Sequence, residues 1–218
     1  MKKDLFVRGF DSDLHGELSQ IANEEGVPLA SLVEDAVDKW LQYKKETSAR
    51  HILLMYDDEE SMVNALREID RMTNDKLFKT CFGPTSHTGM KFLRKHGWFD
   101  ATLSPYTRLF DRPKQYFGQV RQNIVSEAGA SQAFIIGFIP GDMCHERSLP
   151  EANKLEHMYD SNRIVGTTTC LFPIKDILGA DMEDILTLVK LHDESYILQK
   201  DKLYRFRVTE ESLHKLVG

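Results

Sequence analysis

An apolar stripe in residues 28–41 is the feature that most constrains how this chain folds. Pro28 suits the first turn of a helix, and Gly26 supplies the stop of a preceding one. The apolar side chains of the new helix recur at i, i+3 and i+4: Leu29, Leu32, Val33, Ala36, Val37, Trp40 and Leu41. This stripe is too wide for a two-helix hairpin of this size to bury alone. It therefore predicts that two copies of the chain pack together here.

The segment before the stripe predicts a strand and a first helix. Residues 3–10 form a short, β-prone segment, and Asp11-Ser12-Asp13 after it is a cluster of residues that favour the N-cap of a helix. The apolar residues of the helix then recur on one face: Leu14, Leu18, Ile21 and Ala22. A lone strand has two unpaired edges and is not stable by itself. Antiparallel pairing with the same strand of a second copy would stabilise it.

The residues that carry this order are Val7-Arg8-Gly9-Phe10, Leu14, Leu18, Ala22, Gly26, Val33 and Ala36-Val37. They resemble the ribbon-helix-helix regulators of bacteria and archaea. The resemblance implies a homodimer whose paired strands enter the major groove of DNA. It implies DNA contacts from Lys2, Lys3, Phe6 and Arg8. Arg8 is expected to read a base, and the two lysines to touch phosphate.

The charge of this module favours another reading. Residues 1–46 contain six Lys or Arg against ten Asp or Glu, a net charge of −4. Phosphate contacts supply much of the affinity of a DNA-binding protein, and Asp4 shares a strand face with Phe6 and Arg8. The alternative is therefore a module that dimerises without binding DNA.

The polar stretch Tyr43 to Arg50 is predicted to link this module, residues 1–46, to a larger domain, residues 47–218. Strand and helix patterns alternate through that domain. Strands are predicted at 51–56, 76–82, 102–110, 132–139, 164–172, 196–199 and 203–208, and helices at 59–72, 88–96, 113–128, 150–159 and 182–191. The most hydrophobic strand, 132–139, is expected in the middle of a parallel sheet. This alternation predicts an α/β doubly wound fold.

Signatures of common catalytic sites are absent from the sequence. No glycine is followed by lysine, so the chain has no G-x-x-x-x-G-K-[ST] phosphate loop. The corresponding place after the first strand holds Asp57-Asp58-Glu59-Glu60, whose carboxylates would repel a triphosphate. Neither G-x-S-x-G nor H-E-x-x-H occurs. We therefore expect a protein that is not an enzyme, with a catalytic site near His51 and His192 as the weaker alternative.

Landmarks of the larger domain carry a second resemblance. They are His51-Ile-Leu-Leu-Met-Tyr56-Asp57, Leu155-Glu156, Val165-Gly166, Cys170, Ile185-Leu186 and Leu191-His192. They resemble the methanogen and methylotroph sensory (MEDS) domain of the dichloromethane-responsive repressor family. This implies a RecA-like or KaiC-like domain that senses a small hydrocarbon-derived ligand without hydrolysing nucleotides. It implies a ligand pocket containing His51, Tyr56, Cys170 and His192, although each of these residues equally fits a structural role.

Histidine and cysteine spacings do not match a metal site. Cys81 and His87 flank a Gly-Pro turn, Cys144 and His145 are adjacent, and His157 stands alone on a predicted helix. We therefore expect no metal and no cofactor. The three cysteines are too few for a disulfide framework, and no signal-peptide core or membrane-spanning apolar run occurs. The sequence thus predicts a cytoplasmic protein with no membrane partner.

Together these patterns predict a dimeric transcriptional regulator. Its N-terminal ribbon would bind DNA while the α/β domain senses a small molecule, and a short linker would couple the two. The alternative is a dimeric signalling or partner protein that does not bind DNA.

Overall fold

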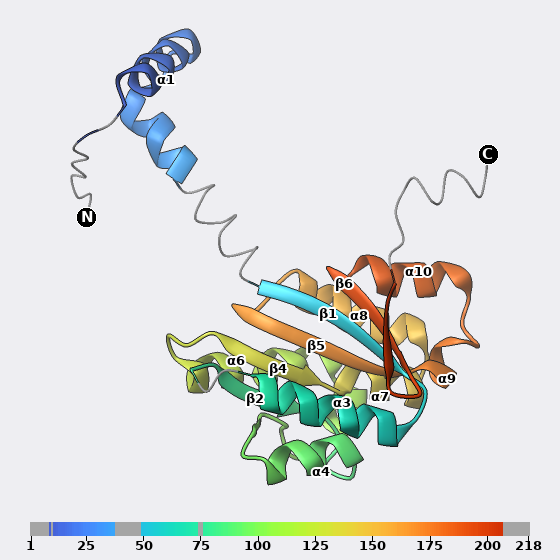
Figure 1. Ribbon diagram of the computed structural model, residues 1–218. Helices are drawn as coiled ribbons and strands as arrows, with labels where there is room; N and C mark the ends of the chain where they lie inside the picture. The colour runs from blue at the N-terminus through green and yellow to red at the C-terminus, as the bar shows by residue number, and fades with distance from the viewer. Residues whose placement is uncertain (1–8, 10, 38–48, 74–75, 207–218) are drawn as a thin grey trace. The chain divides into compact units, whose positions relative to one another are not determined.

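A computed structural model describes residues 9, 11–37, 49–73 and 76–206 of the chain (Figure 1). The chain divides into two compact units, Met1–Thr47 and Ser48–Gly218. The predicted strand at 3–10, apart from Gly9, lies outside the described residues, as do the predicted DNA contacts Lys2, Lys3, Phe6 and Arg8.

In the N-terminal unit, α1 spans Ser12–Glu25. Asp11 caps this helix, because its Oδ1 accepts hydrogen bonds from two backbone N–H groups of the first turn, at 2.9 and 3.1 Å. Gly26 ends it with a φ of 68°, a left-handed conformation that favours glycine. Residues 29–37 are again helical. The first predicted helix and the beginning of the second are therefore confirmed.

Apolar side chains of this unit remain uncovered within one chain. Leu14, Ile21 and Val37 are 47%, 41% and 42% exposed. Their exposure is what the predicted packing of two copies would remove.

The larger unit is built on a mostly parallel sheet. Its strand order is β3 (Phe99–Asp100), β2 (Phe78–Phe82), β4 (Ala133–Gly137), β5 (Gly166–Pro173), β1 (Ala49–Tyr56), β6 (Glu194–Gln199) and β7 (Lys202–Phe206). Neighbouring strands are parallel except β6 and β7, which form the predicted antiparallel hairpin. The hydrophobic β4 has parallel partners on both sides, as predicted.

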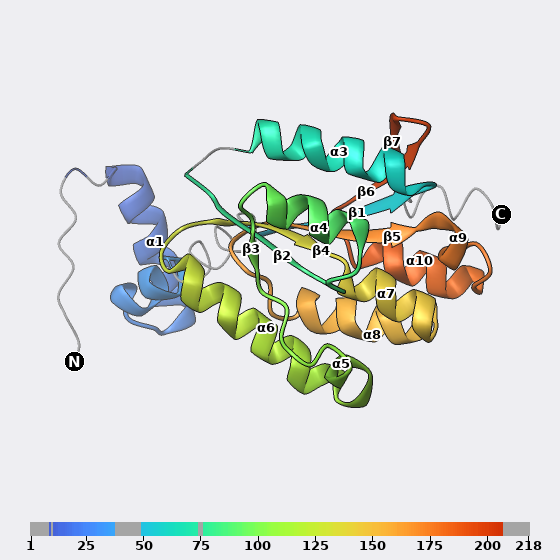
Figure 2. The same cartoon turned by 90° about the horizontal axis from the view of Figure 1, so that it is seen from below.

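Helices cover both faces of this sheet, which confirms the predicted α/β architecture. The helices are α3 (Glu59–Met72), α4 (Thr88–Lys95), α5 (Arg108–Asp111), α6 (Pro113–Ala128), α7 (Ile139–Glu146), α8 (Leu149–Asp160), α9 (Ile174–Ile177) and α10 (Met182–Lys190). Figure 2 shows α3 and α4 on one side of the sheet and α6, α7, α8 and α10 on the other. None of the helices that the structure describes is long and apolar enough to cross a membrane.

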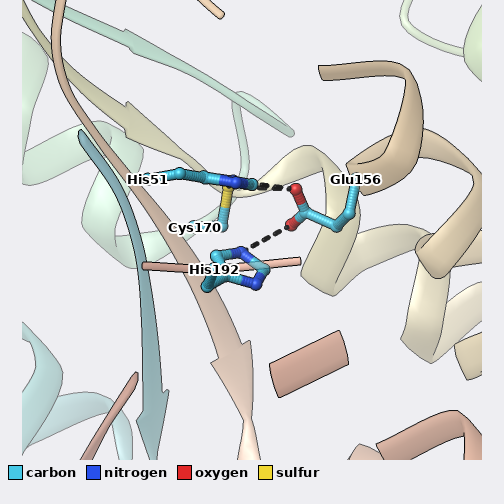
Figure 3. A group of neighbouring side chains, drawn as sticks. All are labelled: His51, Glu156, Cys170 and His192. Atoms are coloured by element: carbon cyan, nitrogen blue, oxygen red, sulfur yellow. Dashed lines mark hydrogen bonds and ion pairs between the residues drawn. The ribbon is translucent and has the colours of Figure 1, made fainter. Parts of the chain in front are cut away.

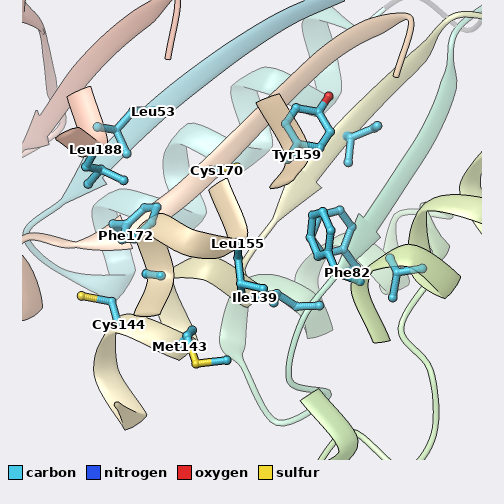
Figure 4. Packing of buried hydrophobic residues seen from close by; sticks show 14 of the residues in the cluster. Leu53, Phe82, Ile139, Met143, Cys144, Leu155, Tyr159, Cys170, Phe172 and Leu188 are labelled. Atoms are coloured by element: carbon cyan, nitrogen blue, oxygen red, sulfur yellow. The ribbon is translucent and has the colours of Figure 1, made fainter. Parts of the chain in front are cut away.

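The larger apolar core lies between the sheet and the helices α6, α7 and α8 (Figure 4). Leu53, Phe82 and Phe172 reach it from the strands, and Ile139 and Leu155 from the helices. A smaller core lies against α3 and α4. The candidate site described next is embedded in the larger core.

The predicted strand at 102–110 is wrong. The chain leaves the sheet after β3, and residues 108–111 form the short helix α5. The backbone N–H and oxygen of Leu103 both bond the Tyr116 hydroxyl, at 3.1 and 2.8 Å, so they are not available to a neighbouring strand. Pro105 has no N–H to donate to a sheet.

Besides α5, two of the described helices were not predicted, α7 and α9. The strand predicted at 132–139 ends at Gly137, and α7 begins at Ile139 with Pro140 in its first turn. Ile139, Met143 and Cys144 of α7 are buried, so an apolar helix directly continues an apolar strand. Periodicity does not separate two such segments.

Candidate functional site

Four polar side chains meet inside the larger core (Figure 3). His51 lies on β1, Cys170 on β5 and Glu156 on α8, while His192 follows α10. Leu53 pairs with Cys170 across β1 and β5. Side chains alternate along a strand, so His51 shares the sheet face of Leu53 and lies diagonally from Cys170. We call His51, Glu156, Cys170 and His192 the polar cluster.

The Glu156 carboxylate is the centre of the polar cluster. Its Oε2 lies 3.1 Å from His51 Nε2 and 3.5 Å from Cys170 Sγ. Its Oε1 lies 3.6 Å from His192 Nε2, too far for a hydrogen bond. His51 Nε2 is also 3.4 Å from Cys170 Sγ. With one ligand atom taken from each residue, all four atoms lie within 4.8 Å of one another.

Backbone carbonyls orient both imidazole rings. His51 Nδ1 lies 2.9 Å from the Leu191 oxygen, and His192 Nδ1 lies 2.7 Å from the Leu188 oxygen. A carbonyl oxygen only accepts, so each Nδ1 carries a hydrogen. Each Nε2 of a neutral ring then turns a lone pair toward the Glu156 carboxylate, which also only accepts. This arrangement is unfavourable unless a proton or a metal cation lies between the acceptors.

The polar cluster is closed to solvent. His51 and Glu156 are 0% exposed, and Cys170 and His192 are 2% and 7% exposed. Burial lowers the pKa of His51, and the interaction with Glu156 offsets part of this effect. Burial alone would raise the pKa of the Glu156 carboxyl, but the neighbouring His192 and His51 hold it below its usual range. Burial and the Glu156 carboxylate raise the pKa of the Cys170 thiol well above its usual value.

Two buried atoms of the polar cluster have no hydrogen-bond partner in the described part of the chain. They are Glu156 Oε1 and His192 Nε2. An unsatisfied buried polar atom typically costs about 1–3 kcal/mol. Native cores contain few such atoms, and each calls for an explanation such as function.

Neighbouring residues hold His51 in place. Its backbone N–H donates to Asp193 Oδ2 at 2.7 Å, and the same oxygen accepts from Arg163 Nη1 at 2.6 Å. The His192 ring lies 3.9 Å from the His51 ring, between centroids, and the Tyr159 ring lies 4.6 Å from it. These contacts fix the backbone of His51 at the start of β1 and pack its ring between His192 and Tyr159.

Three of the four predicted ligand-binding residues come together, and Tyr56 does not. His51 and Tyr56 are five positions apart on β1, so they face opposite sides of the sheet. The Tyr56 hydroxyl instead lies 3.4 Å from His87 Nε2. Both residues line a cavity of about 350 Å³ at the carboxyl ends of β1, β4 and β5, which no member of the polar cluster lines.

The cavity beside Tyr56 and His87 is acidic. Its carboxylates are Asp57, Asp58, Glu59, Asp142 and Asp176. Asp58 caps α3, because its Oδ1 accepts from the Ser61 N–H at 2.8 Å. The loop after β1, where a phosphate loop would lie, therefore carries a helix cap and negative charge.

Sequence reasoning did not predict Glu156 as a site residue. Its helix α8 buries Leu149, Ala152, Leu155 and Tyr159, and Glu156 lies within that buried face. A carboxylate inside an apolar helical stripe was the signal that could have found it.

Comparisons with known proteins bear on the fold alone. No family model matches the chain, and no curated protein matches it. Among solved structures, the chain is similar to a protein from Pyrococcus horikoshii OT3 that was the subject of a structural study. The two share 11% sequence identity with a TM-score of 0.50, over 78% of this chain and 93% of that one. At this identity the likeness shows a shared fold and carries no function.

Proposed function

We propose that the protein is a ligand-responsive regulator and that the polar cluster is its sensory site. The observation that carries this proposal is the pair of unpartnered atoms, Glu156 Oε1 and His192 Nε2, inside an apolar core. A ligand that satisfies them would stabilise the domain. Because the polar cluster is closed to solvent, it suits retention of a small ligand or ion better than repeated exchange of substrate and product.

The position of His51 supports coupling to the rest of the chain. His51 is the third residue of β1, Ala49–Tyr56, and it directly follows Arg50, the last residue of the predicted linker. A ligand that shifts His51 would shift the start of β1 and with it the end of that linker. The ligand has this effect only if it binds the two conformations with different affinity.

In this proposal the N-terminal unit is a ribbon-helix-helix dimer that binds DNA. The capped α1, the left-handed Gly26 and the exposed Leu14 and Val37 support it. The helix-flanked sheet and the acidic loop after β1 support a RecA-like sensory domain of the MEDS kind that does not hydrolyse nucleotides.

Selection from random DNA with the full-length chain tests DNA binding. We expect one sequence to be enriched, and we expect Arg8→Ala to weaken binding to it at least about tenfold. The reason is that a bidentate Arg–guanine contact contributes about 1–3 kcal/mol and a dimer has two copies. Lys2→Ala is the control, because loss of a phosphate contact lowers the affinity and its salt dependence but leaves the sequence preference unchanged.

The opposite result is no enriched sequence even at low salt. The net charge of −4 in residues 1–46 would then explain why the chain does not bind DNA. The N-terminal unit would serve only for dimerisation in a signalling or partner protein.

A further inference from the structure

We infer that the polar cluster binds a divalent first-row transition-metal ion of the zinc type. Two imidazoles, a thiol and a carboxylate are the donors that proteins offer to such ions, whereas magnesium and calcium prefer oxygen alone. The inference names the ligand class of the proposed sensory site. A regulatory role for the ion therefore rests on the proposed function, but ion binding is measured independently of DNA binding.

The spacing of the donor atoms fits a tetrahedral ion. Zinc lies about 2.0–2.2 Å from nitrogen and oxygen and about 2.3 Å from sulfur, so ligand atoms around it are about 3.3–3.8 Å apart. His51 Nε2 lies 3.1 Å from Glu156 Oε2 and 3.4 Å from Cys170 Sγ. His192 Nε2 lies 3.6 Å from Glu156 Oε1. One donor atom from each of the four residues lies within 4.8 Å of the others, so the donor atoms must move together by at most about 1 Å to surround an ion.

The surroundings of both histidines are those of metal ligands. Each Nδ1–H donates to a backbone carbonyl, from Leu191 for His51 and from Leu188 for His192. Metal-bound histidines almost always donate their other ring N–H in this way, because that bond fixes the tautomer and the direction of the ligating lone pair. The Nε2 atoms of both rings point toward the Glu156 carboxylate (Figure 3).

The donor set also balances the charge of a divalent ion. Glu156 brings one negative charge. Cys170 brings a second when the metal–sulfur bond forms and the thiol proton leaves to solvent. With two neutral imidazoles the loaded site carries no net charge, so it avoids an uncompensated charge in the core.

The competing arrangement is a cluster that shares protons without an ion. Protonating one imidazole can join it to Glu156, but Glu156 Oε1 and His192 Nε2 are 3.6 Å apart and make no hydrogen bond. An ion between them would satisfy both atoms. This difference favours the metal site.

Cobalt titration of the full-length chain tests the inference. The chain is stripped with a chelator under reducing conditions and titrated with Co²⁺, and a second sample is purified from zinc-supplemented cells for elemental analysis, because the closed site admits ions slowly. We expect about one ion per chain, visible bands of tetrahedral Co²⁺ and a sulfur-to-cobalt charge-transfer band. Zn²⁺ should abolish these bands.

Two cysteine variants form a matched pair. Cys144 is a buried thiol of the same core, and its Sγ donates to the backbone oxygen of Asp176 at 3.4 Å, outside the polar cluster. Cys170→Ser should lose the charge-transfer band, and Cys144→Ser should keep it. If Cys170→Ser does not fold, His192→Gln is the alternative test, and we expect it to bind Co²⁺ at least about tenfold more weakly than the wild-type chain.

Three results would overturn the inference. They are no ion in either wild-type sample, an octahedral Co²⁺ spectrum typical of surface sites, and a charge-transfer band that persists in folded Cys170→Ser. None of them depends on DNA. A failed DNA selection therefore does not contradict the metal site, and the absence of an ion does not contradict DNA binding.

Discussion

Substituting Glu156 measures how much the contacts of the polar cluster contribute to stability. In the metal-free chain a shared proton joins His51 Nε2 to Glu156 Oε2, and in Glu156→Ala both His51 Nε2 and the Cys170 thiol lose their carboxylate partner. No charge is left behind, because burial lowers the pKa of His51 and the ring becomes neutral. Each newly unsatisfied group costs about 1–3 kcal/mol, so we expect the free energy of unfolding to fall by about 3 kcal/mol.

Glu156→Gln is the matched variant, because it keeps the shape and removes only the charge. The amide NH₂ can donate to one histidine Nε2, and the amide oxygen can accept from the Cys170 thiol. The amide thereby relieves part of the conflict between the histidine Nε2 lone pairs and the carboxylate oxygens. We expect Glu156→Gln to lower the free energy of unfolding by about 1 kcal/mol or less.

Urea unfolding of the chelator-treated chain is the assay. Trp98 is buried in the α/β unit, so its fluorescence in a Trp40→Phe background reports on that unit. With a slope of about 1–3 kcal/mol per molar urea, Glu156→Ala should lower the midpoint by about 1–3 M, and Glu156→Gln by clearly less. The protein concentration is held fixed, because dimerisation affects stability. Equal midpoint shifts for the two variants would show that the acceptor atoms are not in conflict.

Three further predictions concern the assembly, the acidic loop and the packing of α7. Light scattering should give a dimer or a multiple of one, and a stable monomer of 25.1 kDa at micromolar concentration would contradict this prediction. Val37→Glu should be insoluble or unfolded. The chain should not hydrolyse ATP with magnesium, and a rate above a mock preparation that falls in Asp57→Asn would refute this. Gly141→Ala should lower the thermal midpoint, because its Cβ would lie 2.2 Å from the Leu171 oxygen. In α6, a Cβ added at Gly118 would have no neighbouring atom within 4 Å, so Gly118→Ala should instead raise the free energy of unfolding by about 0.5–1 kcal/mol. Equal changes in stability for the two variants would contradict the packing of α7 on β5.

Much of the fold followed from patterns that are local in the sequence. The helix predicted at 113–128 has the bounds of α6, because Pro113 starts it and its apolar periodicity is uninterrupted. The segment 102–110 was mistaken for a strand because the bonds of Leu103 to Tyr116 are tertiary. Apolar content alone cannot reveal such contacts.

The candidate site was only partly predictable. Zinc spacings detect ligands within one short loop, whereas three residues of the polar cluster lie on β1, α8 and β5 and the fourth, His192, follows α10. Their meeting depends on the pairing of β1 with β5 and on the packing of α8 and α10. The second resemblance pointed to three of the four residues. It also pointed to Tyr56, which strand alternation places on the other face of the sheet.

In the proposed regulator, occupancy of the polar cluster controls the N-terminal unit. This control is tested most directly by the DNA affinity of the full-length chain, measured by fluorescence anisotropy on the selected sequence, with Zn²⁺ and after chelation. We expect the two affinities to differ at least about tenfold, a coupling free energy of about 1.4 kcal/mol, and we expect Cys170→Ser to lose this difference. Equal affinities for the zinc-loaded and zinc-free wild-type chain would contradict this control.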